Sequence, residues 1–247
     1  MFRATPGPLP DADARDHAGI ALPPGGIVTA QEGSGAPVAW ISAEVLPEDQ
    51  LNELVRSFAA VFPHTGLWPM QARGLEDGNL DRPWDNGEME GPEGEISDTL
   101  AMLLALNHSA DPTVPAVSAL AAAQPGPDLR PDQLDVEAGG LLLVPVGRPA
   151  DVPAALGWWG GTNYCMSGAD FSSVLRSWED RFGAILVSIG FDTMTVQVGR
   201  RPQTEEQTDA LLREHYGFCP DNIDQGMQPD AFRLGLTQWG YWNFWWD

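Results

Sequence analysis

The stretch from Phe171 to Val198 reads FSSVLRSWEDRFGAILVSIGFDTMTVQV and sets the fold class of the chain. Its first half has apolar residues at helical spacing, which predicts a helix with one buried stripe. The stripe consists of Phe171, Val174, Leu175, Trp178 and Phe182. Residues 184–189 and 193–198 predict two strands, because both are apolar-rich and the second alternates polar and apolar side chains. A helix followed by a hairpin indicates an α+β protein.

Capping signals mark the ends of this helix and of a second one. Ser167 lies three residues before Asp170, and Thr204 lies three residues before Gln207, which is the spacing of a capping box. Gly183 suits the C-terminal stop of the first helix. We expect the second helix to carry His215 inward and to end at Gly217.

Two further strands complete the second half of the chain. Residues 141–146 (LLLVPV) predict a buried strand, and residues 241–246 predict a last strand rich in aromatic side chains. The order strand, helix, strand, strand, helix, strand matches the ferredoxin-like split βαβ arrangement. We therefore expect residues 139–247 to form a C-terminal β-α-β-β-α-β sandwich.

The first half of the chain predicts a smaller α/β region, residues 38–108, with a strand at its start and a helix opened by Pro47. Pro69 makes the following short strand, near residues 66–71, a predicted edge strand. The rest of this half is rich in proline and glycine or in acidic residues. It predicts a flexible arm (1–37), an acidic loop (76–98) and a linker (109–138).

Composition excludes several classes of function. The formal net charge is −22 and the pI is about 4.2, so nucleic acids and anionic membranes are poor partners and a basic protein is a better one. All 13 basic residues are arginine, which excludes Schiff-base lysine chemistry and the phosphate-loop lysine. The two cysteines predict no disulfide framework. Without a long apolar run or a secretory signal, the chain is predicted to be cytoplasmic.

One group of residues could form a catalytic centre. His215 and Cys219 lie four residues apart, with Glu214 and Asp221 beside them. An imidazole can lower the pKa of a thiol and take its proton, which makes a nucleophile. Alternatively, His215 is a core histidine and Cys219 a small buried residue. Both interpretations stay open at this point.

The acidic loop has the ligand spacing of a calcium loop. Acidic and amide side chains stand at loop positions 1, 3, 5, 9 and 12 of an EF-hand: Asp77, Asn79, Asp81, Asp85 and Glu88. However, Arg82 stands where the sharp turn needs glycine, and Pro83 follows it. An acidic surface loop with chance spacing explains the same residues, so we assign no metal and no cofactor.

Two sets of side chains are candidates for binding. On the helix 171–182, Trp178 faces inward and Glu179, Asp180 and Arg181 face outward, either as a solvated face or as the lining of a groove. In the last strand, alternation puts Trp242, Phe244 and Trp246 on a core face and Tyr241, Asn243, Trp245 and Asp247 on the other. Only the second face is available for binding, with Trp245 and Asp247 as the pair to test.

Several long strings resemble one family, the bacterial domain of unknown function 4253, which is common in actinomycetes. They are LVPVGRPADVPAALGWWGGTN (143–163), VLRSWEDRFGA (174–184), GFDTMTVQV (190–198), EHYGFCPDNIDQG (214–226) and WNFWWD (242–247). The resemblance implies a cytoplasmic α+β domain over residues 139–247 and no established activity. It implies these signature positions: Trp178, Glu179, Asp180, Arg181, Phe182, Asp192, Glu214, His215, Cys219, Pro220, Asp221, Trp245, Trp246 and Asp247. Through this resemblance, Asp192 joins the candidates for binding.

Two functions are compatible with these observations. The first is a non-catalytic acidic interaction module, of the kind that neutralises a basic toxin or nuclease as an immunity protein or inhibitor, because opposite charges speed docking. The second is an enzyme that uses Glu214, His215, Cys219 and Asp221. We favour the first, because the sequence contains no complete catalytic set. Nothing in the sequence fixes the oligomeric state.

Overall fold

The structure is a computed structural model that describes residues 2–30, 35–75, 79–85, 88–94, 96, 98–106 and 113–247. Its centre is a mixed seven-stranded sheet with the strand order β3-β4-β6-β5-β7-β8-β9. These strands are β3 (Gly25–Thr29), β4 (Pro37–Ser42), β5 (Leu67–Ala72), β6 (Gly140–Pro145), β7 (Ala184–Ile189), β8 (Thr193–Val198) and β9 (Tyr241–Trp245). β1 (Asp16–His17) and β2 (Ile20–Ala21) form a separate antiparallel pair. The predicted α+β class is confirmed.

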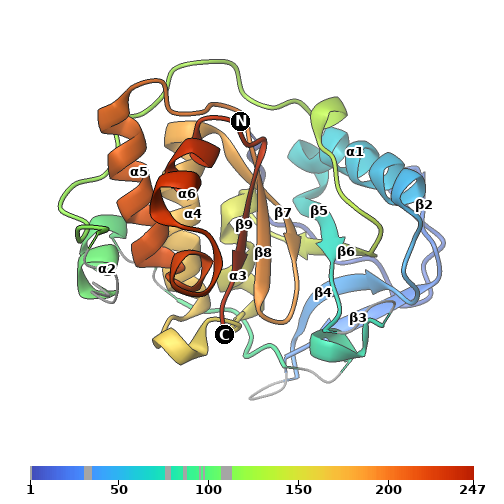
Figure 1. The fold of residues 1–247 in the computed structure, drawn as a ribbon. Coiled ribbons are helices and arrows are strands. Elements are labelled where there is room, and N and C mark those ends of the chain that lie inside the picture. The colour runs from blue at the N-terminus through green and yellow to red at the C-terminus, as the bar shows by residue number, and fades with distance from the viewer. Residues whose placement is uncertain are drawn as a thin grey trace.

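Helices cover both faces of the sheet (Figure 1). One group lies beside β7, β8 and β9, and α1 lies on the other side, next to β5. The helices are α1 (Glu48–Thr65), α2 (Thr99–Leu106), α3 (Val152–Leu156), α4 (Gly168–Phe182), α5 (Glu205–Phe218) and α6 (Pro229–Leu236). Short helical turns occur at η1 (Asp81–Asp85), η2 (Pro131–Gln133), η3 (Pro149–Asp151), η4 (Thr162–Tyr164) and η5 (Asn222–Gly226). None of the described helices has the length and apolar character of a membrane span.

The helix and hairpin that set the fold class form as predicted. Ser167 and Asp170 make a reciprocal capping box at the start of α4, and Gly183 ends the helix in the left-handed conformation with φ 59°. The whole predicted stripe of α4 is buried. Thr204 and Gln207 cap α5 in the same way. Gly217, in contrast, does not end α5, which continues through Phe218.

The ferredoxin-like strand order does not occur. In the sheet, β6 and β7 are separated by β5, a strand from the first half of the chain. β5 is antiparallel to β6 and parallel to β7, so β6 and β7 run in opposite directions. The connection through α4 is therefore not the parallel crossover of a βαβ unit. The sheet also continues across the predicted boundary at residue 139.

β5 is a central strand although it contains Pro69, which the sequence analysis took as the mark of an edge strand. Its pairing with β7 involves only Gln71 and Ala72, beyond the proline. Near the proline, the indole N–H of Trp68 donates to the carbonyl of Leu186 at 2.9 Å. The missing N–H of Pro69 is tolerated because the ladder between β5 and β7 is so short.

The predicted arm and linker are packed against the protein. Phe2 is buried against Trp68, with ring centroids 4.9 Å apart, and Leu22 and Val28 are also buried. In the predicted linker, the Asn52 side chain donates to the carbonyl of Val136 at 2.7 Å and accepts from its N–H at 2.9 Å. The described parts of both segments therefore contribute side chains to the folded core, because apolar side chains spaced along irregular backbone can still be buried.

β9 confirms the predicted alternation. Trp242, Phe244 and Trp246 are at most 2% exposed and pack against α4 and α5 through Trp178 and Phe218. Asn243, Trp245 and Asp247 are exposed, and Tyr241 is half-buried. The aromatic end of the chain is therefore mainly a structural strand with one accessible face.

Candidate functional site

Glu214, a predicted catalytic candidate, is the centre of a buried ion pair. Its carboxylate is fully buried and accepts from both terminal nitrogens of Arg181, at 3.0 and 2.6 Å. It also accepts from the indole N–H of Trp178 at 2.8 Å and from the backbone N–H of Ala121 at 2.5 Å. Every oxygen is used by the fold, so Glu214 is a structural residue.

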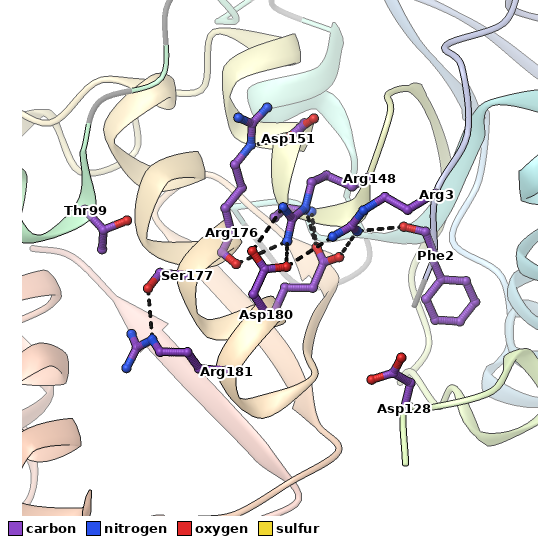
Figure 2. Close-up of polar contacts among 12 residues, drawn as sticks. Phe2, Arg3, Thr99, Asp128, Arg148, Asp151, Arg176, Ser177, Asp180 and Arg181 are labelled. Atoms are coloured by element: carbon purple, nitrogen blue, oxygen red, sulfur yellow. Dashed lines mark hydrogen bonds and ion pairs between the residues drawn. The ribbon is translucent and has the colours of Figure 1, made fainter. Parts of the chain in front are cut away.

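Glu179 has the same role on the opposite side of α4. This buried carboxylate is paired with Arg3 and with Arg148, whose Nε lies 3.2 Å away. Burial raises the pKa of Glu179, and the two guanidinium groups act against that effect. Figure 2 shows Arg3 and Arg148 converging on the neighbouring Asp180, at 3.1 and 2.6 Å. This network fastens the N-terminus to α4.

His215 and Cys219 do not form a catalytic pair. The His215 ring is buried between Trp178 and Phe244, with centroids 4.6 and 5.2 Å away, and neither ring nitrogen has a partner among the described residues. Burial lowers the pKa of His215 to about 3, so the ring is neutral. The Cys219 thiol donates to the carbonyl of Trp245 at 3.0 Å, and burial raises its pKa to about 12. The core interpretation of both residues agrees with this geometry.

Asp221, the fourth catalytic candidate, ties three segments together. Its carboxylate accepts from the Tyr164 hydroxyl at 2.6 Å, from the Gln225 amide at 2.9 Å and from the backbone N–H of Asp247 at 3.0 Å. Burial of Tyr164 and its hydrogen bond to Asp221 raise the pKa of the Tyr164 hydroxyl. Asp221 thus anchors the segment that follows β9.

The described part of the acidic loop is bound to the protein rather than arranged around a cation. Glu93 accepts from the first two N–H groups of α4, Gly168 and Ala169, both at 2.8 Å, and so caps that helix. Glu88 forms an ion pair with Arg82 at 2.6 Å. Of the other calcium candidates, Asn79 and Asp81 bond to each other, Asp77 lies outside the described residues, and Asp85 belongs to η1. Among the described residues, no three acidic, histidine or cysteine side chains form a metal-binding group.

A cleft of about 250 Å³ opens where the acidic loop meets the end of the chain. Carboxylates of Glu88, Asp192 and Asp247 line it. Its apolar lining includes four aromatic side chains, Trp158, Trp159, Phe191 and Trp246, together with Pro83 and Met89. The C-terminus marks this end of the sheet in Figure 1. We call the cleft the acidic cleft.

Close approach of two loops builds one wall of the acidic cleft. The N–H groups of Glu90 and Gly91 donate to the carbonyls of Gly157 and Leu156, at 3.1 and 3.0 Å. Gly157 has φ 64°, and a Cβ there would lie 2.2 Å from the Gly91 carbonyl oxygen, so only glycine fits. The indole N–H of Trp158 donates to the carbonyl of Gly190 at 2.8 Å, which fixes this wall to the hairpin of β7 and β8.

The two aspartates of the acidic cleft lack a basic partner. Asp192 accepts from the indole N–H of Trp245 at 3.2 Å, and neither Asp192 nor Asp247 forms an ion pair within the described part of the chain. Burial raises the pKa of Asp192, and the nearby charge of Asp247 raises it further. The cleft therefore has excess negative charge beside aromatic rings, a combination that attracts a cationic group.

The protein itself shows that this lining suits a guanidinium. At the rim, the guanidinium carbon of Arg82 lies 4.6 Å from the centre of the Phe191 ring while its Nε contacts Glu88. A carboxylate and an aromatic face thus already hold one arginine here. Asp192 and Asp247 provide the same type of acceptor in the lining of the cleft, which also includes Trp246.

Three predicted binding residues lie at or beside the acidic cleft. Asp192 and Asp247 line it, and Trp245 donates to Asp192. Trp178, Glu179, Asp180 and Arg181 belong to the packed network around α4 instead. Trp158, Trp159 and Phe191 were not among the predicted binding residues. The paired tryptophans flanked by glycines in GWWGGTN were the signal for the first two.

The fold is that of an α+β protein with a mixed sheet, and the acidic cleft holds two aspartates without an ion pair among the described residues. Residues 140–247, which begin at β6 and include Asp192 and Asp247 of the cleft, match the family model described as "Domain of unknown function (DUF4253)". No curated protein and no solved structure matches the chain.

Proposed function

We propose that this protein is a non-catalytic interaction module that recognises a basic partner by accepting a cationic side chain in the acidic cleft. The observation that carries the proposal is the pair Asp192 and Asp247, which have no basic partner among the described residues and lie beside Trp246. A lysine or arginine side chain entering the cleft would relieve their repulsion and contact the aromatic wall at the same time.

The net charge supports the same class of partner. A charge of −22 repels nucleic acid and other acidic surfaces and accelerates the approach of a basic protein. An immunity- or inhibitor-type role, in which an acidic protein blocks a basic toxin or nuclease, is the form of this function that fits best. A cytoplasmic location stays part of the proposal.

A catalytic role has less support. Of its four candidate residues, Glu214 is saturated by Arg181 and Trp178, and Asp221 is saturated by three donors. His215 is a neutral ring in the aromatic core, and Cys219 has a raised pKa and a hydrogen bond to a carbonyl. A nucleophile needs a lowered thiol pKa and a base within reach, and this arrangement has neither.

The test is titration of the protein with the peptide acetyl-Arg-Gly-Arg-amide, followed by tryptophan fluorescence and calorimetry at low salt. We expect binding that Asp192→Asn and Asp247→Asn each weaken about tenfold or more. Asp13→Asn, on an exposed residue of the N-terminal segment, makes the same charge change and should leave the affinity nearly unchanged. The same peptide with glutamine in place of arginine should not bind.

Equal affinities for the wild type and the two cleft variants would refute the proposed site. Equal losses in all three variants would mean that only the overall charge matters, which would also refute it. Circular dichroism of each variant checks that the fold is intact.

A further inference from the structure

The free edge of β9 has backbone donors without partners. In the pairing of β8 with β9, the hydrogen bonds from Val198 N–H to the Gly240 carbonyl and from Trp246 N–H to the Asp192 carbonyl fix the register. Hydrogen-bonded pairs alternate, so the even-numbered residues of β9 bond to β8. The backbone groups of Tyr241, Asn243 and Trp245 then point to the free edge.

Two of the three outward carbonyls on this edge are taken, but the N–H groups are not. The side-chain amide of Asn222 donates to the Asn243 carbonyl at 2.8 Å, and the Cys219 thiol donates to the Trp245 carbonyl. Within the described residues, none of the outward N–H groups of Tyr241, Asn243 and Trp245 donates a hydrogen bond. Such an edge is a ready template for another strand.

A groove runs along this edge. It has a volume of about 690 Å³ and is lined by the three outward residues of β9 and, opposite them, by Met227, Phe232 and Trp239. Met227 is 40% exposed and Trp245 is 38% exposed, so the groove presents apolar surface next to unpaired backbone donors. This combination matches recognition by strand addition, in which backbone bonds give affinity and pockets take alternate side chains.

The charge of the surroundings identifies the occupant. The carboxylate of Asp221 lines the groove, the exposed Asp224 lies between the lining residues Asn222 and Gly226, and the indole of Trp245 donates to Asp192 in the acidic cleft. Pairing of β9 with β9 of a second copy would bring two chains of net charge −22 together, with like charges facing each other. A segment with basic side chains faces no such repulsion.

We propose that the groove binds an extended segment of a basic partner as an eighth strand on β9, with apolar side chains against Met227, Phe232 and Trp239. The basic character of the partner rests on the proposed function, whereas the strand pairing rests on the edge alone. A basic residue that extends beyond Trp245 would reach the acidic cleft, so the groove and the cleft form one recognition surface.

The experiment uses a pool of seven-residue peptides in which arginine or lysine alternates with valine, isoleucine, leucine or phenylalanine. Peptides retained by the wild-type protein are resynthesised in two forms, with N-methyl groups on the odd or on the even residues. N-methylation removes backbone donors and blocks one edge of a strand. We expect one form to bind about tenfold or more weakly and the other to bind like the parent, since only one edge faces β9.

Hydrogen exchange of the β9 amides, measured by NMR, reports strand pairing from the side of the protein. Without peptide, the amide protons of Tyr241, Asn243 and Trp245 should exchange fast, while those of Trp242 and Phe244 are protected by β8. With peptide, all three outward amides should become protected. Asn243→Pro removes the central outward donor without breaking a bond to β8 and should weaken binding, whereas Asn243→Ala keeps the donor and should bind nearly as well as the wild type.

Several results would overturn the proposal. They are equal binding of both methylated forms, no retained peptide, and outward amides that are already protected in a dimer of the free protein. The methylated peptides keep the test decisive if Asn243→Pro does not fold. If only one methylated form binds weakly and Asp192→Asn does not change the affinity, the eighth strand is upheld and the cleft is refuted. If Asp192→Asn weakens binding and both methylated forms bind alike, the cleft is upheld and the eighth strand is refuted.

Discussion

Two groups of carboxylates in this protein differ in whether arginine compensates them. Around α4, Glu214 and Glu179 are buried and each is held by guanidinium groups. In the acidic cleft, Asp192 and Asp247 are near each other and form no ion pair within the described residues. The difference separates carboxylates that stabilise the fold from carboxylates whose charge is not compensated within the described residues, and we propose that the second group binds a ligand.

We expect the largest effect from truncating the chain after Asn243, which tests whether the end of the chain stabilises the fold. A chain that ends at Asn243 lacks Phe244 and Trp246, both buried in the aromatic core. Loss of each large aromatic side chain costs on the order of 3–5 kcal/mol, which together approaches the whole stability of a typical domain. We expect the truncated chain to be unfolded by circular dichroism. Trp245→Ala, on the exposed face, should stay folded; a folded truncated chain would show that β9 is dispensable.

The next effect comes from the paired carboxylates. Glu214→Gln leaves the guanidinium of Arg181, which is only 13% exposed, without its counter-charge. Breaking a buried pair from one side costs about 3 kcal/mol or more. Urea unfolding should show this loss. Replacing both partners, Glu214→Gln with Arg181→Met, should recover part of the stability; a single variant within about 0.5 kcal/mol of the wild type would contradict a stabilising pair.

Arg3→Gln should have a smaller effect in the same network. Arg3 is 40% exposed, and Arg148 still pairs with Glu179 after the change. We expect a loss of about 1 kcal/mol in the free energy of unfolding, since exposed pairs contribute little. Arg148→Gln removes the more buried partner and should cost more than Arg3→Gln. The reverse order would mean that the N-terminal segment carries the network.

The acidic cleft should respond to pH, because the pKa of Asp192 is raised. A cation binds the ionised carboxylate, so affinity for the arginine peptide is full above the raised pKa and falls as the pH drops through it. The fall should begin at a higher pH than for an ordinary aspartate, whose pKa is about 3.9. In Asp247→Asn the neighbouring charge that raises this pKa is gone, and the fall should move to lower pH. The same midpoint in both proteins would exclude coupling between the two aspartates.

The sequence predicted the local features well, because they depend on neighbouring residues. The stripe of α4, the two capping boxes and the alternation of β9 all follow from spacings within one element. The strand order did not follow, because it depends on β5 entering between β6 and β7. Pro69 argued against that position, and only the short ladder and the bond from Trp68 to Leu186 make it acceptable.

The acidic cleft was only partly predictable for the same reason. Trp245 and Asp247 were singled out from the alternation of the last strand, and Asp192 from the resemblance to a family. The opposite wall is made when the loop of Glu90 and Gly91 bonds to Leu156 and Gly157, far away in the sequence. Charge counts could not separate Glu214 from Asp192 either, because the arginine that compensates a carboxylate is known only from the fold.

The contrast between the paired carboxylates around α4 and the aspartates of the acidic cleft is tested most directly by one measurement. It is the free energy of unfolding of Asp192→Asn, measured by urea denaturation at neutral pH without ligand. A raised carboxyl pKa means that the charge of Asp192 costs stability above that pKa, and asparagine removes the charge while keeping an acceptor for the Trp245 indole. We predict that Asp192→Asn is more stable than the wild type, opposite in sign to Glu214→Gln. A less stable Asp192→Asn would show that this carboxylate is also compensated, and would contradict the division of the carboxylates into a stabilising group and a proposed binding group.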